Sequence, residues 1–289
     1  MVRTITITDV IICLPGMILL GIWLLRSSLG RKSLAESLPR RNSMPIYLPF
    51  VPLFIWLAVL AVLTFFKEVQ MPELPDWQNS YFDHLILCIG ALVGIAMILF
   101  LARRHFARRL KGFGLGVRRI HRDFAAAALN LVAIYPLVAV ALILTIFMGK
   151  VIHGPEFQMQ KHQELELIGL YSQLELRVLI IITVIFVMPV FEEMLFRGLF
   201  QTTIRSFLEV SPFTDRLRSR AARSWLAIAI SSGLFAAVHA YAGHWPALFV
   251  LAVCMGYAYE KSGSLFRPIF IHAFFNATSI IATLTQPAG

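Results

Sequence analysis

Three ionisable side chains, Glu192, Glu193 and Arg197, lie in an otherwise apolar stretch that reads MPVFEEMLFRGLF over residues 188–200. A charged group at the centre of a membrane-spanning helix costs about 2.5–3.5 kcal/mol on insertion scales, so all three should face the protein interior. Glu193 and Arg197 are four residues apart, on one helical face, in the order that favours an ion pair. Glu192 points about 100° away around such a helix and is free for another partner. Pro189, which lacks an N–H, should kink the helix or loosen its backbone.

Two later apolar stretches also carry side chains that can do acid–base chemistry. Phe235 and His239 are four residues apart, and so are His272 and Asn276. This spacing places both members of each pair on one helical face. If the three polar faces meet around one cavity, a glutamate can act as general base on water, and imidazole and carboxamide donors can stabilise an oxyanion. Such a set of groups fits hydrolysis of an amide bond within the membrane.

Each cluster also has a purely structural interpretation. Glu193 and Arg197 can form a buried ion pair that holds helices together, although this leaves the first glutamate without a role. A single histidine in an apolar helix, such as His239, is often a packing residue with satisfied hydrogen bonds, and His272 with Asn276 can form interhelical hydrogen bonds. Taken separately, the clusters therefore leave both interpretations open.

A metal-dependent mechanism is the chemical alternative. Two histidines and a glutamate can hold zinc with one position open for water. The chain has no HExxH, however, its candidate histidines lie in separate apolar segments, and asparagine is an uncommon zinc ligand. Cys13, Cys88 and Cys254 are isolated in apolar runs and predict neither a disulfide nor a structural zinc site. The sequence predicts no cofactor, with zinc as the alternative.

The composition is that of a polytopic membrane protein. Of 289 residues, 58% are hydrophobic and only 15% are charged, and the mean hydropathy is +0.75. A soluble domain has nearer to about 25% charged residues. The formal charge of +10 could indicate a nucleic-acid partner, but no soluble stretch is long enough to form a separate binding domain. An excess of Lys and Arg beside membrane spans explains the charge, and no nucleic-acid partner is predicted.

Hydropathy predicts an all-α, polytopic transmembrane bundle of about eight spans: Val10–Leu25, Tyr47–Phe66, Phe82–Leu101, Phe124–Met148, Val178–Phe200, Trp225–Tyr241, Ala247–Tyr259 and Pro268–Leu284. The seventh is short, so seven spans and a re-entrant segment are the alternative. We expect an N-terminal transmembrane region with basic cytoplasmic loops over 1–123. A catalytic transmembrane core should follow over 124–289, with its motifs within 178–284. The loop 149–177 mixes acids with leucines at helical spacing, which predicts a short amphipathic helix.

The distribution of basic residues predicts the orientation. Twenty of the 26 Lys and Arg residues lie in alternate loops, 26–46, 102–123, 201–224 and 260–267. By the positive-inside rule these loops are cytoplasmic and both termini are non-cytoplasmic. We expect a multi-pass protein of the plasma membrane, which in bacteria is the inner membrane.

Three motifs in successive apolar segments carry a family resemblance. EEMLFR at 192–197 matches EExxxR, FAAVH at 235–239 matches FxxxH, and HAFFN at 272–276 matches HxxxN. In this order they resemble the CPBP family, the CaaX protease and bacteriocin-processing (Abi) intramembrane proteases, to which the type II CaaX prenyl endopeptidases belong. The resemblance covers roughly residues 178–284.

The resemblance implies a glutamate-dependent membrane endopeptidase. Glu192 would activate the attacking water, His239 would position it or shuttle its proton, and His272 and Asn276 would stabilise the tetrahedral oxyanion. The ion pair beside Glu192 would set the charge and geometry around it. Counting from the span boundaries places His272 nearer the cytoplasmic end than Glu192 and His239, which requires a tilted or late-starting last helix.

The resemblance leaves the substrate open. Eukaryotic relatives cut prenylated C-terminal CaaX peptides, and bacterial ones are associated with bacteriocin maturation, self-immunity and regulation of membrane proteins. The expected partners are a peptide or membrane-protein substrate and membrane lipids. A non-catalytic scaffold or immunity factor that binds peptides in the polar cavity is the alternative function. An ion-coupled transporter is disfavoured because the first four spans are nearly free of polar residues.

Overall fold

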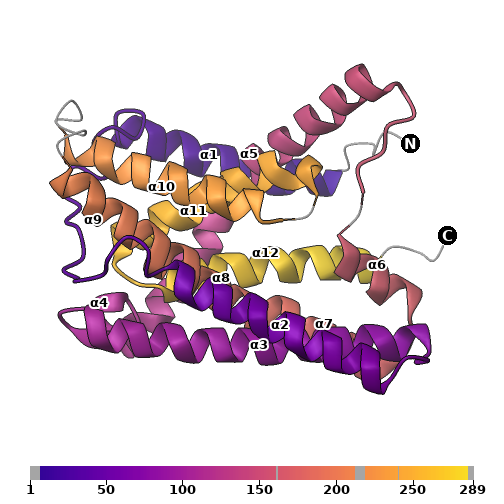
Figure 1. Cartoon of the computed structure of the whole chain (residues 1–289). Coiled ribbons are helices and arrows are strands. Elements are labelled where there is room, and N and C mark those ends of the chain that lie inside the picture. The colour runs from indigo at the N-terminus through magenta and orange to yellow at the C-terminus, as the bar shows by residue number, and fades with distance from the viewer. Residues whose placement is uncertain (1–6, 161, 212–218, 240, 286–289) are drawn as a thin grey trace.

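The chain folds as a bundle of helices in a computed structural model, which describes residues 7–160, 162–211, 219–239 and 241–285 (Figure 1). These ranges contain no β-strand, and one isolated bridge pairs Asn42 with Phe106. The predicted all-α fold is therefore confirmed. The α-helices are α1 (Ile7–Arg26), α2 (Phe50–Gln70), α3 (Asp76–His105), α4 (Arg109–Phe113), α5 (Ile120–His153), α6 (Gln163–Leu170), α7 (Leu174–Ile182), α8 (Met188–Glu193), α9 (Thr202–Val210), α10 (Arg220–Ala237), α11 (Trp245–Ser262) and α12 (Phe266–Leu284).

Short segments of other helical types link some of these elements. Two π-helical segments, η2 (Thr183–Val187) and η3 (Met194–Gln201), join α7, α8 and α9 into one continuous helix. Single 3₁₀ turns precede α5 and α11, at η1 (Val117–Arg119) and η5 (Ala242–His244). The helix predicted in the loop 149–177 is present as α6.

Four helical segments are long and apolar enough to cross a membrane: Phe50–Gln70, Asp76–His105, Val117–His153 and Leu174–Val210. A shorter apolar helix runs over Cys13–Arg26. Each of the eight predicted spans overlaps a helix, and the short seventh one lies within the single helix α11. These helices indicate a membrane-embedded protein, whereas the number of crossings stays a prediction.

The outer surface of the bundle is apolar. Phe54, Phe65 and Phe100 project from α2 and α3 and are each more than 60% exposed, which suits contact with lipid. In the interior, by contrast, the acid Glu193 and the base Arg197 are completely buried. Polar groups thus face inward, as the cost of placing them in lipid requires.

The three motif-bearing segments are neighbours in the bundle. Helix α12 packs against α5, α11, η2 and α8, and α10 packs against α11 and η3. Helix α3 closes the other side, on α7 and α8, and its Gly94 leaves room for the ring of Phe191, which any Cβ at this position would overlap. The N-terminal helices therefore supply part of the wall around the motifs. The division of the chain into an N-terminal transmembrane region (1–123) and a catalytic core (124–289) stays a prediction.

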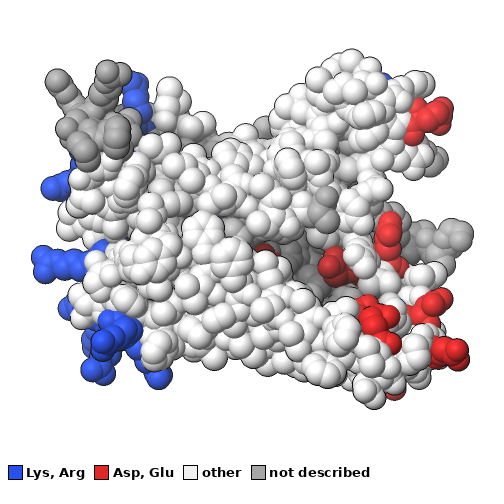
Figure 2. All heavy atoms as spheres, in the orientation of Figure 1, with Lys and Arg blue, Asp and Glu red and all other residues white. Residues whose placement is uncertain are grey.

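Opposite charges gather at opposite ends of the bundle (Figure 2). On the face in Figure 2 most of the visible Lys and Arg side chains gather at the end where α1, α3 and α11 terminate, and most of the visible Asp and Glu side chains gather toward the other end (Figures 1 and 2). Helix α1 begins and α12 ends at the acidic end. Arg216 and Arg218, which contribute to the predicted asymmetry, lie outside the described residues. The two charged ends agree with the alternation of basic loops, and the orientation in the membrane stays a prediction.

Candidate active site

The first motif lies in the middle of the continuous helix, between the two π-helical segments. Pro189 is in the first turn of α8, directly after η2, so the predicted loosening of the backbone takes the form of a π-helical segment. In a π-helix the N–H of a residue bonds to the carbonyl five residues earlier. The carbonyl that Pro189 leaves unpaired in this pattern is that of Val184, and Asn276 Nδ2 donates to it at 2.8 Å. The proline thereby creates an acceptor that anchors the third motif to the first.

The predicted ion pair between Glu193 and Arg197 is present and has no exposed surface. Arg197 Nη1 donates to Glu193 Oε1 at 3.1 Å, and Nε lies 3.1 Å from Oε2. The remaining nitrogen, Nη2, donates to the Ala252 carbonyl at 3.3 Å. A buried guanidinium is stable only with such compensation, since the penalty for removing it from water is several kcal/mol, on the order of the gain from pairing.

Glu193 also holds the histidine of the third motif. His272 Nδ1 lies 3.0 Å from Glu193 Oε1. Because a carboxylate that pairs with Arg197 can only accept hydrogen bonds, Nδ1 is the donor, which fixes the ring and leaves Nε2 for another group. The second glutamate of the motif is therefore engaged by the arginine on one side and the imidazole on the other, with both hydrogen bonds on Oε1 and with Oε2 held to Arg197 as an ion pair.

Glu192 lacks such partners. Its side chain is 16% exposed, and its buried Oε2 accepts no hydrogen bond from the residues that the structure describes. Oε2 lies 3.9 Å from His272 Nε2, which is beyond hydrogen-bonding distance. A buried carboxylate oxygen without a donor is costly, and such atoms point to a role with water or a ligand.

Phe235 connects the second motif to the other two. Its buried ring centroid lies 4.5 Å from Arg197 Cζ, 4.8 Å from the His239 ring and 5.7 Å from the His272 ring. His239 Nδ1 lies 2.8 Å from the Phe235 carbonyl, so Nδ1 is the donor and Nε2 is left free. Trp245 Nε1 donates to the His239 carbonyl at 2.9 Å. The sequence places Phe235 and His239 on one face, and the structure adds that the phenyl ring is the common contact of the site.

The late start of α12 explains the depth of His272. Val210, at the basic end of the long helix, is 17 residues beyond Glu193, or about 25 Å at 1.5 Å per residue. Helix α12 begins at Phe266, only six residues or about 9 Å before His272. Since His272 bonds to Glu193, the last helix starts well inside the level at which α9 ends. Of the two explanations that the sequence leaves open, a tilted or a late-starting last helix, the structure shows the late start.

A second group of histidines lies beside His239. His162 stacks on His244 with ring centroids 5.1 Å apart, and its centroid is 6.5 Å from that of His239. His244 is buried, and its Nε2 contacts the Gln160 carbonyl at 2.9 Å. The loop before α6 thus reaches the edge of the site. Neither periodicity nor a motif marks His162 in the sequence; its only signal is the spacing HxE to Glu164.

The ion pair between His162 and Glu164 should make this loop contact dependent on pH. The 2.9 Å hydrogen bond to Glu164 raises the pKa of His162 above its ordinary value, against the lowering effect of burial. Burial tends to raise the pKa of Glu164, but the bond to His162 and other local interactions lower it below its ordinary value. A raised histidine pKa stabilises the fold below about 6.5, and a lowered glutamate pKa does so above about 4.5. The contact should be strongest between these values and weaken as the pH rises through the raised pKa of His162.

The pH at which His162 loses its proton can be measured from its modification by diethyl pyrocarbonate at a series of pH values, because only the neutral imidazole reacts. In the Glu164→Gln variant the midpoint of reactivity should move down toward the ordinary histidine value of about 6.5. Glu166→Gln, on the same short helix and exposed, is the matched control and should leave the midpoint unchanged. Equal midpoints in both variants would contradict the pairing.

The Phe235→Leu variant should lose activity that a matched substitution of another buried aromatic retains. It keeps an apolar side chain in place but removes the ring from Arg197, His239 and His272, contacts worth about 1–2 kcal/mol in total. We expect cleavage of a peptide substrate to fall at least about tenfold as both imidazoles lose a wall. Phe106→Leu, a buried aromatic paired with Phe113 at the basic end, is the control for stability and should retain activity. Equal losses of activity would contradict the role of Phe235.

The candidate metal ligands do not converge. Within the described ranges, no group of three or more His, Cys, Asp or Glu side chains is placed to hold a metal ion. His272 lies 3.0 Å from Glu193 Oε1 and 3.9 Å from Glu192 Oε2, whereas the contacts of His239 are with the Phe235 ring and carbonyl. The expectation that the protein uses no cofactor, with zinc as the alternative, stays a prediction.

The fold and the site together define a helical membrane protein with a buried carboxylate–imidazole centre assembled from three motifs. Residues 174–278, about a third of the chain, match the family model described as Rce1-like, type II CAAX prenyl endopeptidase Rce1-like. The match spans all six predicted site residues and confirms the resemblance to the CPBP family. Over this segment the chain is similar to CAAX-type intramembrane proteases, and the family indicates a peptidase. No curated protein and no solved structure matches the chain.

Proposed function

We propose that the protein is an intramembrane endopeptidase in which Glu192 activates water for attack on a peptide carbonyl. The observation that carries this proposal is the difference between two adjacent glutamates. Glu193 forms an ion pair with Arg197 and a hydrogen bond with His272, whereas Glu192 Oε2 comes only within 3.9 Å of His272 Nε2 and accepts no hydrogen bond from the described residues. The match to type II CAAX prenyl endopeptidases supports the choice of a peptide bond as the target.

In this mechanism the water oxygen bonds to the carbonyl carbon while its proton passes to Glu192. The carbonyl π bond opens, and its electron pair forms the oxyanion of a tetrahedral intermediate. As the oxyanion collapses, the C–N bond breaks, and the proton held by Glu192 reaches the departing nitrogen directly or through an imidazole. The products are a carboxylic acid and an amine, which together account for the substrate and one water.

The other site residues take roles that their free atoms allow. His239 Nε2, at the more open edge of the site, positions the water or carries its proton. His272 Nε2 faces Glu192 and, when protonated, stabilises the oxyanion. Asn276 Nδ2 spends one N–H on Val184 and has a second to donate. Glu193 and Arg197 are positioning residues that act through His272.

The substrate we propose is a hydrophobic, membrane-associated or prenylated peptide. The bundle is hollowed on the face in Figure 2, and acidic side chains are visible inside the hollow. A peptide that reaches this site must pass between apolar helices, which favours an apolar or lipidated chain. We also propose a bacterial inner-membrane location with the basic end cytoplasmic, supported by the separation of charges along the bundle.

The test is cleavage of a membrane peptide reporter by the purified protein in liposomes, with products identified by mass spectrometry. We expect a new N-terminus within the reporter and a rate that EDTA and 1,10-phenanthroline leave within about twofold, since a glutamate base needs no metal. Loss of activity with the chelators, restored by zinc, would replace the mechanism with a metal-dependent one. No cleavage of any reporter, with biological function retained by Glu192→Gln, would favour the non-catalytic peptide-binding scaffold.

A further inference from the structure

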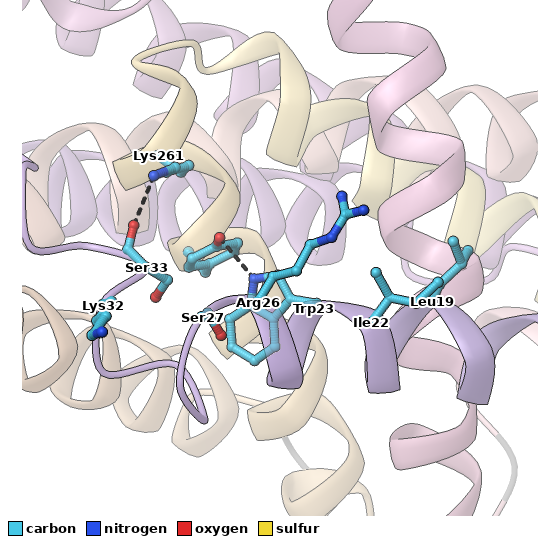
Figure 3. Close-up of a pocket in the computed structure, with 9 residues that line it drawn as sticks. Leu19, Ile22, Trp23, Arg26, Ser27, Lys32, Ser33 and Lys261 are labelled. Carbon is cyan, nitrogen blue, oxygen red and sulfur yellow. Dashed lines mark hydrogen bonds between the residues drawn. The ribbon is translucent and has the colours of Figure 1, made fainter.

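A cleft of about 410 Å³ lies at the basic end of the bundle, between α1 and α11 (Figure 3). Its lining includes three cations, Arg26, Lys32 and Lys261, which come from the end of α1, the turn after it and the end of α11. Ser27 and Ser33 add hydroxyl groups. Within the described part of the chain no acidic side chain lines the cleft. The cleft therefore offers positive charge and hydrogen-bond donors, which suit a phosphate group.

The turn that carries Lys32 adopts an unusual backbone conformation. Ser28, Leu29 and Gly30 all have positive φ, at 52°, 56° and 81°, a region that disfavours the first two. Several hydrogen bonds hold the turn, among them three that involve Ser27 and Ser33. Gly30 N–H donates to Ser27 Oγ at 2.9 Å, Lys32 N–H donates to the Ser27 carbonyl at 3.0 Å, and Lys261 Nζ donates to the Ser33 carbonyl at 2.8 Å. The strained turn brings the cations of two distant segments to one opening.

An aromatic cluster forms the base of the cleft. Trp23 Nε1 donates to the Tyr257 hydroxyl at 2.9 Å, and their rings meet edge to face with centroids 5.4 Å apart. Trp225 stacks on the other side of Tyr257, at 5.7 Å, and donates to the Gly30 carbonyl at 3.2 Å. Gly30 fits beside both tryptophans, where a Cβ would lie 3.2 Å from the Trp23 ring. The base is thus rigid, and Trp and Tyr are typical of the membrane–water interface.

The surroundings of the cleft are apolar on the side of α1. Leu19 and Ile22 line it, and Leu25 and Leu29 beside it are 84% and 70% exposed. Exposed leucines among cations, at the end of an apolar helix, suit the boundary between headgroups and acyl chains. A soluble anion would use only the cations, whereas a phospholipid would use the cations for its phosphate and the leucine side of α1 for its acyl chains.

We propose that this cleft binds the phosphate headgroup of an anionic phospholipid from the leaflet at the basic end. Its acyl chains would lie along Leu19 and Ile22. Arg26 and Lys32 are exposed and have no partner among the described residues, so their donors are free for the ligand. The site is independent of the peptidase centre, and its test does not depend on catalysis.

A second basic cleft supplies the control. Arg103, Arg104, Arg108, Arg109 and Lys111 line it at the junction of α3 and α4, with Phe100 and Leu110. All these residues come from one stretch of chain, and neither a tryptophan nor a hydroxyl lines it within the described residues. Arg103 and Arg104 match Arg26 and Lys32 in charge and exposure. Their replacement removes the same charge from the same end of the bundle.

The experiment is native mass spectrometry of the full chain in mild detergent, titrated with phosphatidylglycerol, phosphatidylcholine or glycerol 3-phosphate. We expect the wild type to bind one phosphatidylglycerol preferentially, and Arg26→Gln/Lys32→Gln to bind it about tenfold more weakly, given the attraction of each cation near a membrane surface. Arg103→Gln/Arg104→Gln should stay within about threefold of the wild type. Thermal melting without added lipid checks that each variant is folded. Should the double variant melt early, the single Lys32→Gln should still weaken binding about threefold.

Three results would overturn the proposal. Equal weakening in the two double variants would mean diffuse attraction to the basic end rather than a site. Equal affinity for phosphatidylcholine would remove the role of net negative charge. Binding of glycerol 3-phosphate as tight as that of phosphatidylglycerol would mean a site for soluble phosphates.

Discussion

Glu192→Gln is expected to abolish peptide cleavage while the protein stays folded. Glutamine has nearly the shape of glutamate but cannot accept a proton from water, and loss of a general base costs about 10²–10⁴ in rate. The fold should tolerate the change because the Glu192 side chain is not held by the buried network that joins Glu193, Arg197 and His272. We therefore expect kcat to fall at least a hundredfold, about 3 kcal/mol of barrier, with a melting temperature equal to that of the wild type within a few degrees.

Two controls separate catalysis from charge and structure. Glu175→Gln removes an exposed carboxylate from the start of the same long helix and should leave cleavage unchanged. Glu192→Asp keeps the carboxylate but withdraws it by one methylene, and should retain part of the activity. Undiminished cleavage by Glu192→Gln would exclude it as the base. A loss of activity accompanied by early melting would assign it a structural role instead.

The sequence predicts the ion pair because that pair is local. Glu193 and Arg197 are one turn apart, and the cost of charge in an apolar helix leaves few ways to neutralise them. The same cost predicts that the polar faces of the three motifs turn inward. Both predictions follow from helical geometry and solvation, and neither requires knowledge of how the helices pack.

The partners of His272 and Asn276 depend on contacts between helices that spacing cannot supply. His272 lies on Glu193 and faces Glu192, although the sequence offers both glutamates equally. Asn276 donates to a carbonyl that is available because of Pro189 and the adjacent π-helical segment. A change in hydrogen-bond register within a helix is not encoded by hydropathy, so this acceptor could not be predicted.

The contacts of Phe235 and His162 could not be predicted from the sequence for a similar reason. Phe235 is one of 23 phenylalanines, and only the packing shows that its ring meets Arg197 and two histidines. His162 lies in a loop of mixed composition and reaches His239 through the course of that loop. Long-range contacts of this kind are set by the helix arrangement rather than by local pattern.

Breaking the buried pair from one side should strongly destabilise the protein. Arg197→Met leaves the Glu193 carboxylate in a fully buried position with only His272 beside it, and Glu193→Leu leaves the guanidinium facing apolar groups. Removal of one partner of a buried pair costs about 3–5 kcal/mol. Unfolding of each variant in mixed micelles with increasing SDS measures this loss. Glu209→Gln is the milder comparison on the same helix: the Glu209 side chain is 20% exposed and pairs with Arg205 and Arg223, and the buried Arg205 keeps Glu260 as a second partner, so the loss should be only about 1 kcal/mol.

The double variant Glu193→Leu/Arg197→Met distinguishes stability from function. Apolar side chains of similar volume can replace a buried ion pair at little cost, so the double variant should recover most of the stability lost by either single variant. Cleavage should nevertheless stay at least about a hundredfold below that of the wild type, because His272 Nδ1 has lost the acceptor that fixes its ring and tautomer. Recovery of both stability and cleavage would reduce the pair to a structural element. Recovery of stability without cleavage would instead support a role of the pair through His272. In that variant the fold is restored, but His272, which faces Glu192, has lost its hydrogen bond to Glu193.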